Sequence, residues 1–149
     1  MIEDNNFMLM AIDEALLAFK EDEVPIGAII TLNGKVVGRG HNIRNKTNNA
    51  IDHAEILAIS DACKNLGRWI LDDCTIYVTS EPCLMCAGAI SQARIKKIVY
   101  GVSSPKYGVC ESVDHVFDNE LIFHNIEMIK GIEKEKIENM MKEFFKHLR

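Results

Sequence analysis

The sequence predicts an α/β domain of three layers, in which helices cover both faces of a mixed five-stranded sheet. Asn33 and Gly34 lie between two apolar runs, and this dipeptide is a strong signal for an antiparallel hairpin. From residue 75 onward, strand-like and helix-like segments alternate, which favours right-handed crossovers and parallel pairing. A chain of 149 residues suits one hydrophobic core, and we expect a single domain over residues 1–149.

Each expected element follows from a local pattern. Residues 6–20 carry apolar side chains at helical spacing, whereas residues 42–51 are polar, rich in asparagine and without periodicity, which predicts a loop. Residues 75–79 are mostly β-branched or aromatic, as strands prefer, and Gly67 is typical of a helix end. The remaining expectations are strands over residues 29–32, 35–41, 98–100 and 126–129, helices over residues 53–66, 83–93 and 133–148, and a loop over residues 103–113.

Composition points to a globular protein of the cytoplasm. Apolar residues make up 48% of the chain and charged residues 26%. No run approaches the roughly 18 apolar residues of a membrane span, and the acidic start of the chain is unlike a signal peptide, so we expect no membrane partner. Five cysteines are an odd number, which argues against a disulfide framework. We expect Cys63 and Cys74 to be small buried side chains, and the sequence assigns no role to Cys110.

The chemistry of the chain concentrates in two motifs about thirty residues apart. The first contains His53 and Glu55, and the second contains Pro82, Cys83 and Cys86. Imidazole and thiolate groups bind zinc, and a catalytic zinc keeps three protein ligands with a fourth position for water. His53 and Glu55 most easily share a site at the start of a helix, and proline is favoured in the first turn of one. We expect His53, Cys83 and Cys86 to bind one Zn²⁺, with Glu55 as the catalytic acid and base.

Two other uses of these residues fit the sequence less well. A structural zinc needs four protein ligands, but the sequence has no second Cys-x-x-Cys pair to supply the fourth. A redox Cys-x-x-Cys pair would leave the preceding Pro82 and the distant His53 unexplained. The catalytic reading explains all of these residues together.

The net charge of −5 leaves two kinds of substrate open. Neutralisation of phosphates supplies most of the non-specific affinity of proteins for nucleic acid. An acidic chain therefore suits either a small neutral substrate or an RNA that binds a locally basic patch.

The paired motif resembles that of the zinc-dependent nucleobase deaminases. Within that superfamily the chain is most similar to the bacterial tRNA-specific adenosine deaminases, and the similarity covers nearly its whole length. The residues that carry it lie in segments 23–28, 40–42, 53–55, 81–90 and 94–95, in Lys106 and Gly108, and in Phe144, Phe145 and Arg149. The sequence departs from the family's usual pattern at Asp52, Ser80 and Tyr107, which bears on the contacts with RNA and not on the zinc chemistry.

The resemblance implies a cytidine-deaminase-like fold and hydrolysis of the wobble adenosine of tRNA to inosine. It implies that Asn42 holds the nucleoside, that the backbone N–H of Ala54 contacts the base, and that Glu81 helps to floor the pocket. The other substrate-binding residues that it implies are Ile26, Pro82, Lys106 and Phe145.

The resemblance also implies one zinc ion per subunit and a homodimer with tRNA, but not DNA, as its partner. Met85 and Ile90 are the candidate interface positions. Phe144 and Phe145 are adjacent on the expected last helix and point about 100° apart, so we expect unequal burial.

Two rival functions remain. A free guanine or cytosine deaminase would use the same zinc machinery, and the negative charge favours such a small substrate. A zinc-binding or RNA-binding module without catalysis would not need Glu55.

Overall fold

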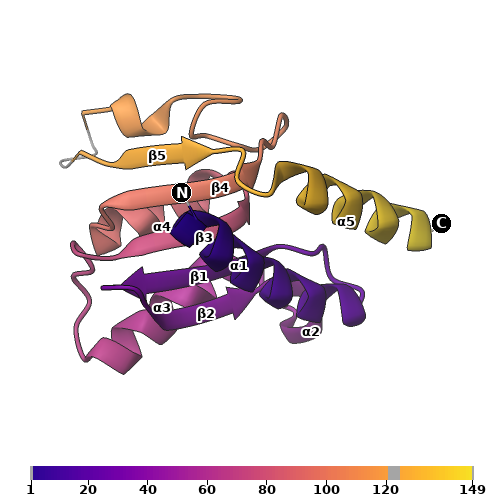
Figure 1. The fold of residues 1–149 in the computed structure, drawn as a ribbon, viewed down its shortest axis with the longest axis horizontal. Helices are drawn as coiled ribbons and strands as arrows, with labels where there is room; N and C mark the ends of the chain where they lie inside the picture. Colours follow the sequence, from indigo (N-terminus) through magenta and orange to yellow (C-terminus); the bar gives the residue numbers. More distant parts are fainter. Residues whose placement is uncertain (1, 121–124, 149) are drawn as a thin grey trace.

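The computed structural model describes residues 2–120 and 125–148, so Arg149 lies outside the described residues. Helices cover both faces of one five-stranded sheet, and α5 extends past the end of the sheet (Figure 1). The expected three-layer α/β architecture is therefore confirmed. The elements are α1 (Ile2–Lys20), β1 (Gly27–Leu32), β2 (Lys35–His41), α2 (Arg44–Thr47), α3 (Ala54–Leu66), β3 (Thr75–Ser80), α4 (Leu84–Ala93), β4 (Lys97–Val102), η1 (Val116–Asp118), β5 (Glu127–Lys130) and α5 (Lys134–His147).

The sheet has the strand order β2-β1-β3-β4-β5 and mixed pairing. β1 is antiparallel to both β2 and β3, whereas β3, β4 and β5 run parallel to one another. Asn33 and Gly34 both have positive φ values, 52° and 77°, as the tight turn between β1 and β2 requires. The predicted hairpin and the predicted parallel crossovers are both present.

Alternate residues of the central strands point into two separate cores. One core lies between the sheet and helices α3 and α4, and it includes Ile30, Ile76 and Ile98. The other lies between the sheet and helices α1 and α5, and it includes Ile29 and Val99. Because both faces of these strands are covered, their sequences read as nearly continuous apolar runs.

The prediction of a loop over residues 42–51 is wrong in one respect, because this segment contains the single helical turn α2. Apolar periodicity could not reveal this turn, since polar side chains hold it. Asn42 Oδ1 accepts the N–H of Arg44 at 3.1 Å, and Glu23 accepts the N–H groups of Asn45 and Lys46. Helix α1 also begins earlier than expected, with Glu3 and Asp4 in its first turn, where negative charge is favourable.

The described part of the chain contains no helix long and apolar enough to cross a membrane. All five cysteines are free thiols. Cys74 and Cys110 are buried and Cys63 is half-buried, so the expected burial of a small side chain holds for Cys74 and only in part for Cys63.

Candidate active site

The two motifs meet because each one opens a helix. His53 is the N-cap of α3 and Cys83 is the N-cap of α4, both in extended backbone conformations. β3 ends at Ser80 and delivers the second motif beside the first, and α3 packs against α4. The first turns of two helices thus form one site at the end of β3, as the sequence predicted.

Three ligand atoms in this site have the spacing that zinc needs. The Nδ1 atom of His53 lies 3.7 Å from Sγ of Cys83 and 3.6 Å from Sγ of Cys86. A tetrahedral ion with Zn–S of about 2.3 Å and Zn–N of about 2.0 Å would place a nitrogen and a sulfur ligand about 3.5 Å apart. Among the described residues, these three form the one cluster of potential metal ligands. The residues present therefore fit a zinc ion with three protein ligands.

The thiols of Cys83 and Cys86 differ in pKa, because the hydrogen bond between them shifts the two values in opposite directions. The hydrogen bond from Cys86 has the largest effect on the pKa of Cys83. Together with a hydrogen bond to His53 it lowers this pKa to about 4, although burial of the thiol acts to raise it. The same hydrogen bond and burial raise the pKa of Cys86. The hydrogen bond with Cys83 raises the pKa of His53. Cys83 is therefore the more easily ionised of the two thiols, which favours binding of a metal cation.

Glu55 lies in the first turn of α3 with its carboxyl group buried. Burial raises the pKa of Glu55 to about 7. Its Oε1 atom is buried and has no hydrogen-bond partner in the protein. A hydrogen bond with Cys86 partly opposes the effect of burial on the pKa of this carboxyl group. Few buried polar atoms lack a partner, and the exceptions are often catalytic. This oxygen is free to exchange a proton with a substrate or with water.

A pocket lies directly over these groups. Its lining includes Ile26, Asn42, Ala54, Glu81 and Phe145 from the set predicted for substrate binding. The lining also includes residues outside that predicted set, namely Val24, Arg44, Ser80, Ser104, Tyr107 and Met141. Strand ends, the α2 turn, the loop after β4 and helix α5 all contribute to this wall.

Glu81 anchors the loop that forms one side of the pocket. Its carboxylate accepts backbone N–H groups from four residues of this loop at 2.9–3.1 Å, and also the hydroxyl of Ser112. Burial alone would raise the pKa of Glu81, but these hydrogen bonds lower it overall. The four donors are Ser104, Cys110, Glu111 and Ser112. Glu81 therefore shapes the pocket mainly through the loop that it holds.

Asn42 and Ala54 present polar groups to the pocket. The Nδ2 atom of Asn42 donates to the carbonyl of Val24 at 3.3 Å, and its Oδ1 atom accepts the N–H of Arg44. These bonds fix the amide and leave it one further donor and one further acceptor. Ala54 is the first residue of α3, where backbone N–H groups lack partners within the helix.

The sequence matches the MafB19-like deaminase family over residues 2–149. It is 42% identical to the tRNA-specific adenosine deaminase of Bacillus subtilis, over 100% of this chain and 92% of that protein. The same enzyme of Rickettsia felis is 44% identical over 95% of this chain and 100% of that protein. The chain belongs to the tRNA-specific adenosine deaminase family.

Solved structures agree with this assignment. A structure from work on tRNA:A34 deaminases that edit the wobble position has a TM-score of 0.87 and 40% identity, over 91% of this chain and 98% of that chain. A guanine deaminase of Nitrosomonas europaea has a TM-score of 0.82 at 20% identity, over 94% of this chain and 83% of that chain. The second likeness shows the shared fold alone. The family and fold implied by the sequence motifs are thereby confirmed.

Some residues that the family resemblance singled out lie away from the pocket wall. Lys106 is exposed, and its Nζ atom lies 5.5 Å from the ring centre of Tyr107. Pro82 is buried, and its carbonyl accepts the N–H of Val109 instead of lining the cavity.

Phe144 is 1% exposed and packs on Phe19, whereas Phe145 is 45% exposed, so the expected unequal burial is confirmed.

One of the two candidate interface residues is wrong. Ile90 is completely buried in the core between α4 and the sheet, so it cannot contact a second subunit. Met85 is half-buried and remains a candidate. Helix α4 instead exposes Leu84 and Gly88 on its outer face.

Proposed function

We propose that this protein hydrolyses the wobble adenosine of a tRNA anticodon loop to inosine and ammonia. The observation that carries the proposal is the buried carboxyl group of Glu55, a residue that lines the pocket beside three potential zinc-ligand atoms and whose Oε1 atom has no hydrogen-bond partner in the protein. The similarity to tRNA-specific adenosine deaminases at 42% and 44% identity supports the choice of substrate. A tRNA substrate also places the enzyme in the cytoplasm.

His53, Cys83 and Cys86 would hold one zinc ion per subunit. Their spacing fits a tetrahedral site, and the two soft thiolates and the imidazole suit zinc better than a hard cation. When bound, the ion would lower the pKa of a water molecule towards about 7.

Glu55 would move the protons of the reaction. Its carboxylate takes a proton from the attacking water, whose oxygen forms a bond to C6 of adenosine. The carboxyl group donates this first proton to N1 of the ring. It then takes the second proton from the new hydroxyl group on C6 and donates it to the departing amine, so that the bond from C6 to nitrogen breaks, C6=O forms and ammonia leaves. A pKa of about 7 suits both directions of transfer, since the group can be ionised or protonated near neutral pH.

The pocket wall would hold the flipped nucleoside through three kinds of contact. Asn42 offers an amide with spare hydrogen-bonding capacity, and Ala54 offers a backbone N–H at a helix start. Phe145 offers an exposed ring on which a base of the anticodon loop can stack.

The proposal includes a homodimer through the outer face of α4. Leu84 is 64% exposed, and it follows the metal ligand Cys83 directly. The family resemblance implies a homodimer with this helix as the candidate interface, and an exposed apolar side chain there would be buried against the second subunit. Leu84→Asp is expected to convert a dimer to a monomer in sedimentation velocity. A variant that sediments as the wild type does would contradict this interface.

The test of the reaction offers zinc-loaded enzyme an adenosine-wobble stem-loop and, in parallel, free guanine, cytosine and adenine. Ammonia release and mass spectrometry of the digested RNA are the readouts. Inosine in the stem-loop alone is the expected result. Turnover of a free base alone would overturn the tRNA assignment and favour the free-base deaminase. Zinc binding without turnover of any substrate would favour a non-catalytic module.

A further inference from the structure

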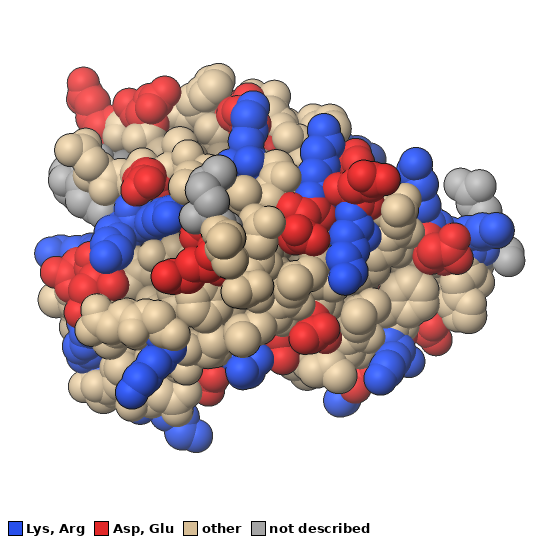
Figure 2. All heavy atoms as spheres, viewed as in Figure 1, with Lys and Arg blue, Asp and Glu red and all other residues tan. Residues whose placement is uncertain are grey.

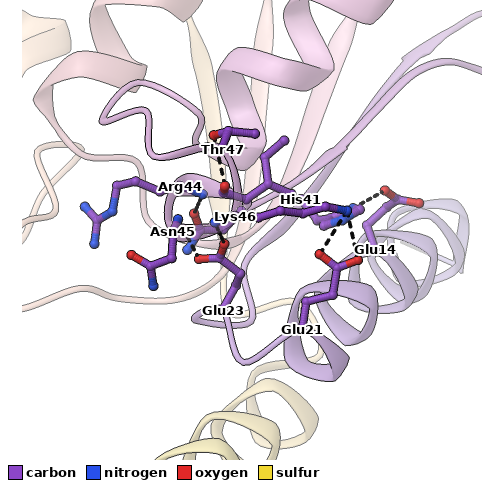
Figure 3. A network of polar contacts seen from close by, with 10 residues as sticks. Glu14, Glu21, Glu23, His41, Arg44, Asn45, Lys46 and Thr47 are labelled. Carbon is purple, nitrogen blue, oxygen red and sulfur yellow. Dashed lines mark hydrogen bonds and ion pairs between the residues drawn. The ribbon is translucent and has the colours of Figure 1, made fainter.

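The helical turn α2 is held in place by a buried carboxylate from another part of the chain. Glu23 is 1% exposed, and it accepts the backbone N–H groups of Asn45 at 3.1 Å and Lys46 at 2.7 Å (Figure 3). Burial of a carboxylate is costly unless hydrogen bonds compensate for the lost water, and these two charge-assisted bonds do so only while the N–H groups stay in place. Glu23 therefore fixes the position of the turn.

The same turn is joined to the pocket. Asn42, which lines the pocket, accepts the N–H of Arg44 at 3.1 Å and donates to the carbonyl of Val24 at 3.3 Å. Val24 follows Glu23 in the chain and also lines the pocket. Glu23, Asn42 and the turn thus form one connected unit at the rim of the site.

The two cations of this turn have different surroundings. Lys46 lies 3.3 Å from Glu21, so its charge is matched. Within residues 2–120 and 125–148 no ion pair is found for Arg44, which is exposed and is the one lysine or arginine of the pocket lining. Figure 3 shows the side chains of Arg44 and Lys46 leaving the turn in opposite directions.

The carboxylates of the pocket do not compete for Arg44. Glu81 is occupied by the N–H groups of its loop, and Glu55 is buried beneath the ligand cluster. The chain carries a net charge of −5, and Figure 2 shows acidic and basic side chains interspersed on the face that it draws. An unpaired guanidinium at the mouth of this pocket is therefore well placed to bind an anion beside the substrate.

We infer that Arg44 binds a backbone phosphate of the RNA next to the target adenosine, and that Glu23 is the positioning residue that holds the α2 turn for this contact. The inference rests on the proposed function and names a residue for recognition of its RNA substrate. A planar guanidinium matches two phosphate oxygens. It would fix the register of the loop without reading its sequence.

Arg44→Ala tests the phosphate contact on zinc-loaded enzyme and the wobble stem-loop. KM is expected to rise about tenfold with kcat nearly unchanged, as the loss of one charge-assisted bond predicts. Raising salt from about 50 to 200 mM should weaken the variant less than the wild type, because one counterion-releasing contact is gone; the slope of log KM against log salt should fall by about 0.7. Arg44→Lys should restore part of both effects.

Lys35→Ala is the matched control, since it removes an exposed cation at the far end of β2. It should leave KM and the salt slope close to wild type. An unchanged KM and slope in Arg44→Ala would overturn the inference, as would a loss confined to kcat. An equal effect of Lys35→Ala would show that Arg44 contributes no more than any other surface charge, and it would also overturn the inference.

A double-mutant cycle tests the role of Glu23. Glu23→Gln leaves one acceptor for the two N–H groups and should raise KM several-fold with little change in kcat. In the Arg44→Ala background the same substitution should no longer change KM, because Glu23 acts through Arg44. Additive effects in folded variants would overturn the positioning role. Should Glu23→Gln fail to fold, Arg44→Gln still tests the phosphate contact.

Different results would contradict the proposed function and the role of Arg44. If the wild-type enzyme forms no inosine in the stem-loop, the proposed function fails. If the wild type forms inosine and Arg44→Ala shows wild-type KM and salt dependence, the inference alone fails.

Discussion

Gly108 leaves the space that the carboxylate of Glu81 occupies. A Cβ atom on Gly108 would lie 2.3 Å from Cδ and 2.4 Å from Oε1 of Glu81. The carboxylate cannot retreat, because four backbone N–H groups of residues 104–112 surround it. The pair therefore holds the loop after β4 against the end of β3. Glu81 binds the N–H groups of the loop, and Gly108 leaves room for the Glu81 carboxylate because it has no side chain.

Gly108→Ala should disturb this loop. The added methyl group forces the backbone or the carboxylate to shift, which we expect to lower the free energy of unfolding by about 1–3 kcal/mol. Turnover of the stem-loop should fall with it, because the neighbouring Tyr107 lines the pocket. Urea unfolding and steady-state kinetics measure the two effects. In a Glu81→Ala background the same substitution should cost little, and an undiminished cost there would show that the clash lies elsewhere.

Glu81→Gln should destabilise the enzyme most at neutral pH. The amide accepts fewer of the loop's N–H groups, and we expect a loss of about 3 kcal/mol at pH 7. The pKa of Glu81 in the folded protein lies below its ordinary value of 4.5. The stability that it contributes is thus present above about pH 4.5 and lost as the pH falls through the folded-state pKa. Urea unfolding of both proteins from pH 7 to pH 3.5 should show their difference narrowing only at the acidic end, and a difference independent of pH would refute this role.

The overall fold was predictable because its signals are local. The Asn33 and Gly34 turn, the β-branched strand at Thr75–Ser80 and the alternation of strands and helices all lie in contiguous sequence. The turn α2 was missed because its determinants are not contiguous. Glu23 lies more than twenty residues before the N–H groups that it accepts, and no periodicity records such a bond.

The residues of the candidate site also fall into those with a local sequence signal and those placed by contacts between distant parts of the chain. The cluster of His53, Cys83 and Cys86 was predictable because each side chain brings its own chemistry at a fixed spacing in the sequence. Arg44 and Met141 entered the pocket wall through tertiary packing, and an ordinary charged or apolar side chain gives no sign of this in sequence. Ile90 was misplaced for the reverse reason, since spacing along α4 did not reveal which face the sheet covers.

Glu55→Gln should separate stability from catalysis. We expect turnover to fall about 10³-fold or more, because the amide cannot exchange protons, while zinc content by atomic absorption stays near one per subunit.

In the metal-free protein the pKa of Glu55 is raised from 4.5 to about 7, so ionisation destabilises the fold as the pH rises through this range. The metal-free variant should therefore be more stable than the metal-free wild type at pH 8, by about 3 kcal/mol, and nearly equal to it at pH 4.5. A wild type that is more stable at pH 8 would show that the buried carboxylate has a partner in solution.

Removal of the metal should make Cys83 the most reactive thiol of the protein. With zinc bound, Cys83 and Cys86 are ligands, and iodoacetamide should modify the half-buried Cys63 first. After chelation, Cys83 is a half-buried thiolate with a pKa of about 4, whereas burial raises the pKa of Cys110 to about 12. Mass spectrometry of tryptic peptides should then find Cys83 alkylated before Cys63, with Cys110 unmodified until the protein unfolds. Because alkylation depends on the thiolate and on its exposure, an order that chelation does not change would show that Cys83 is not among the metal ligands.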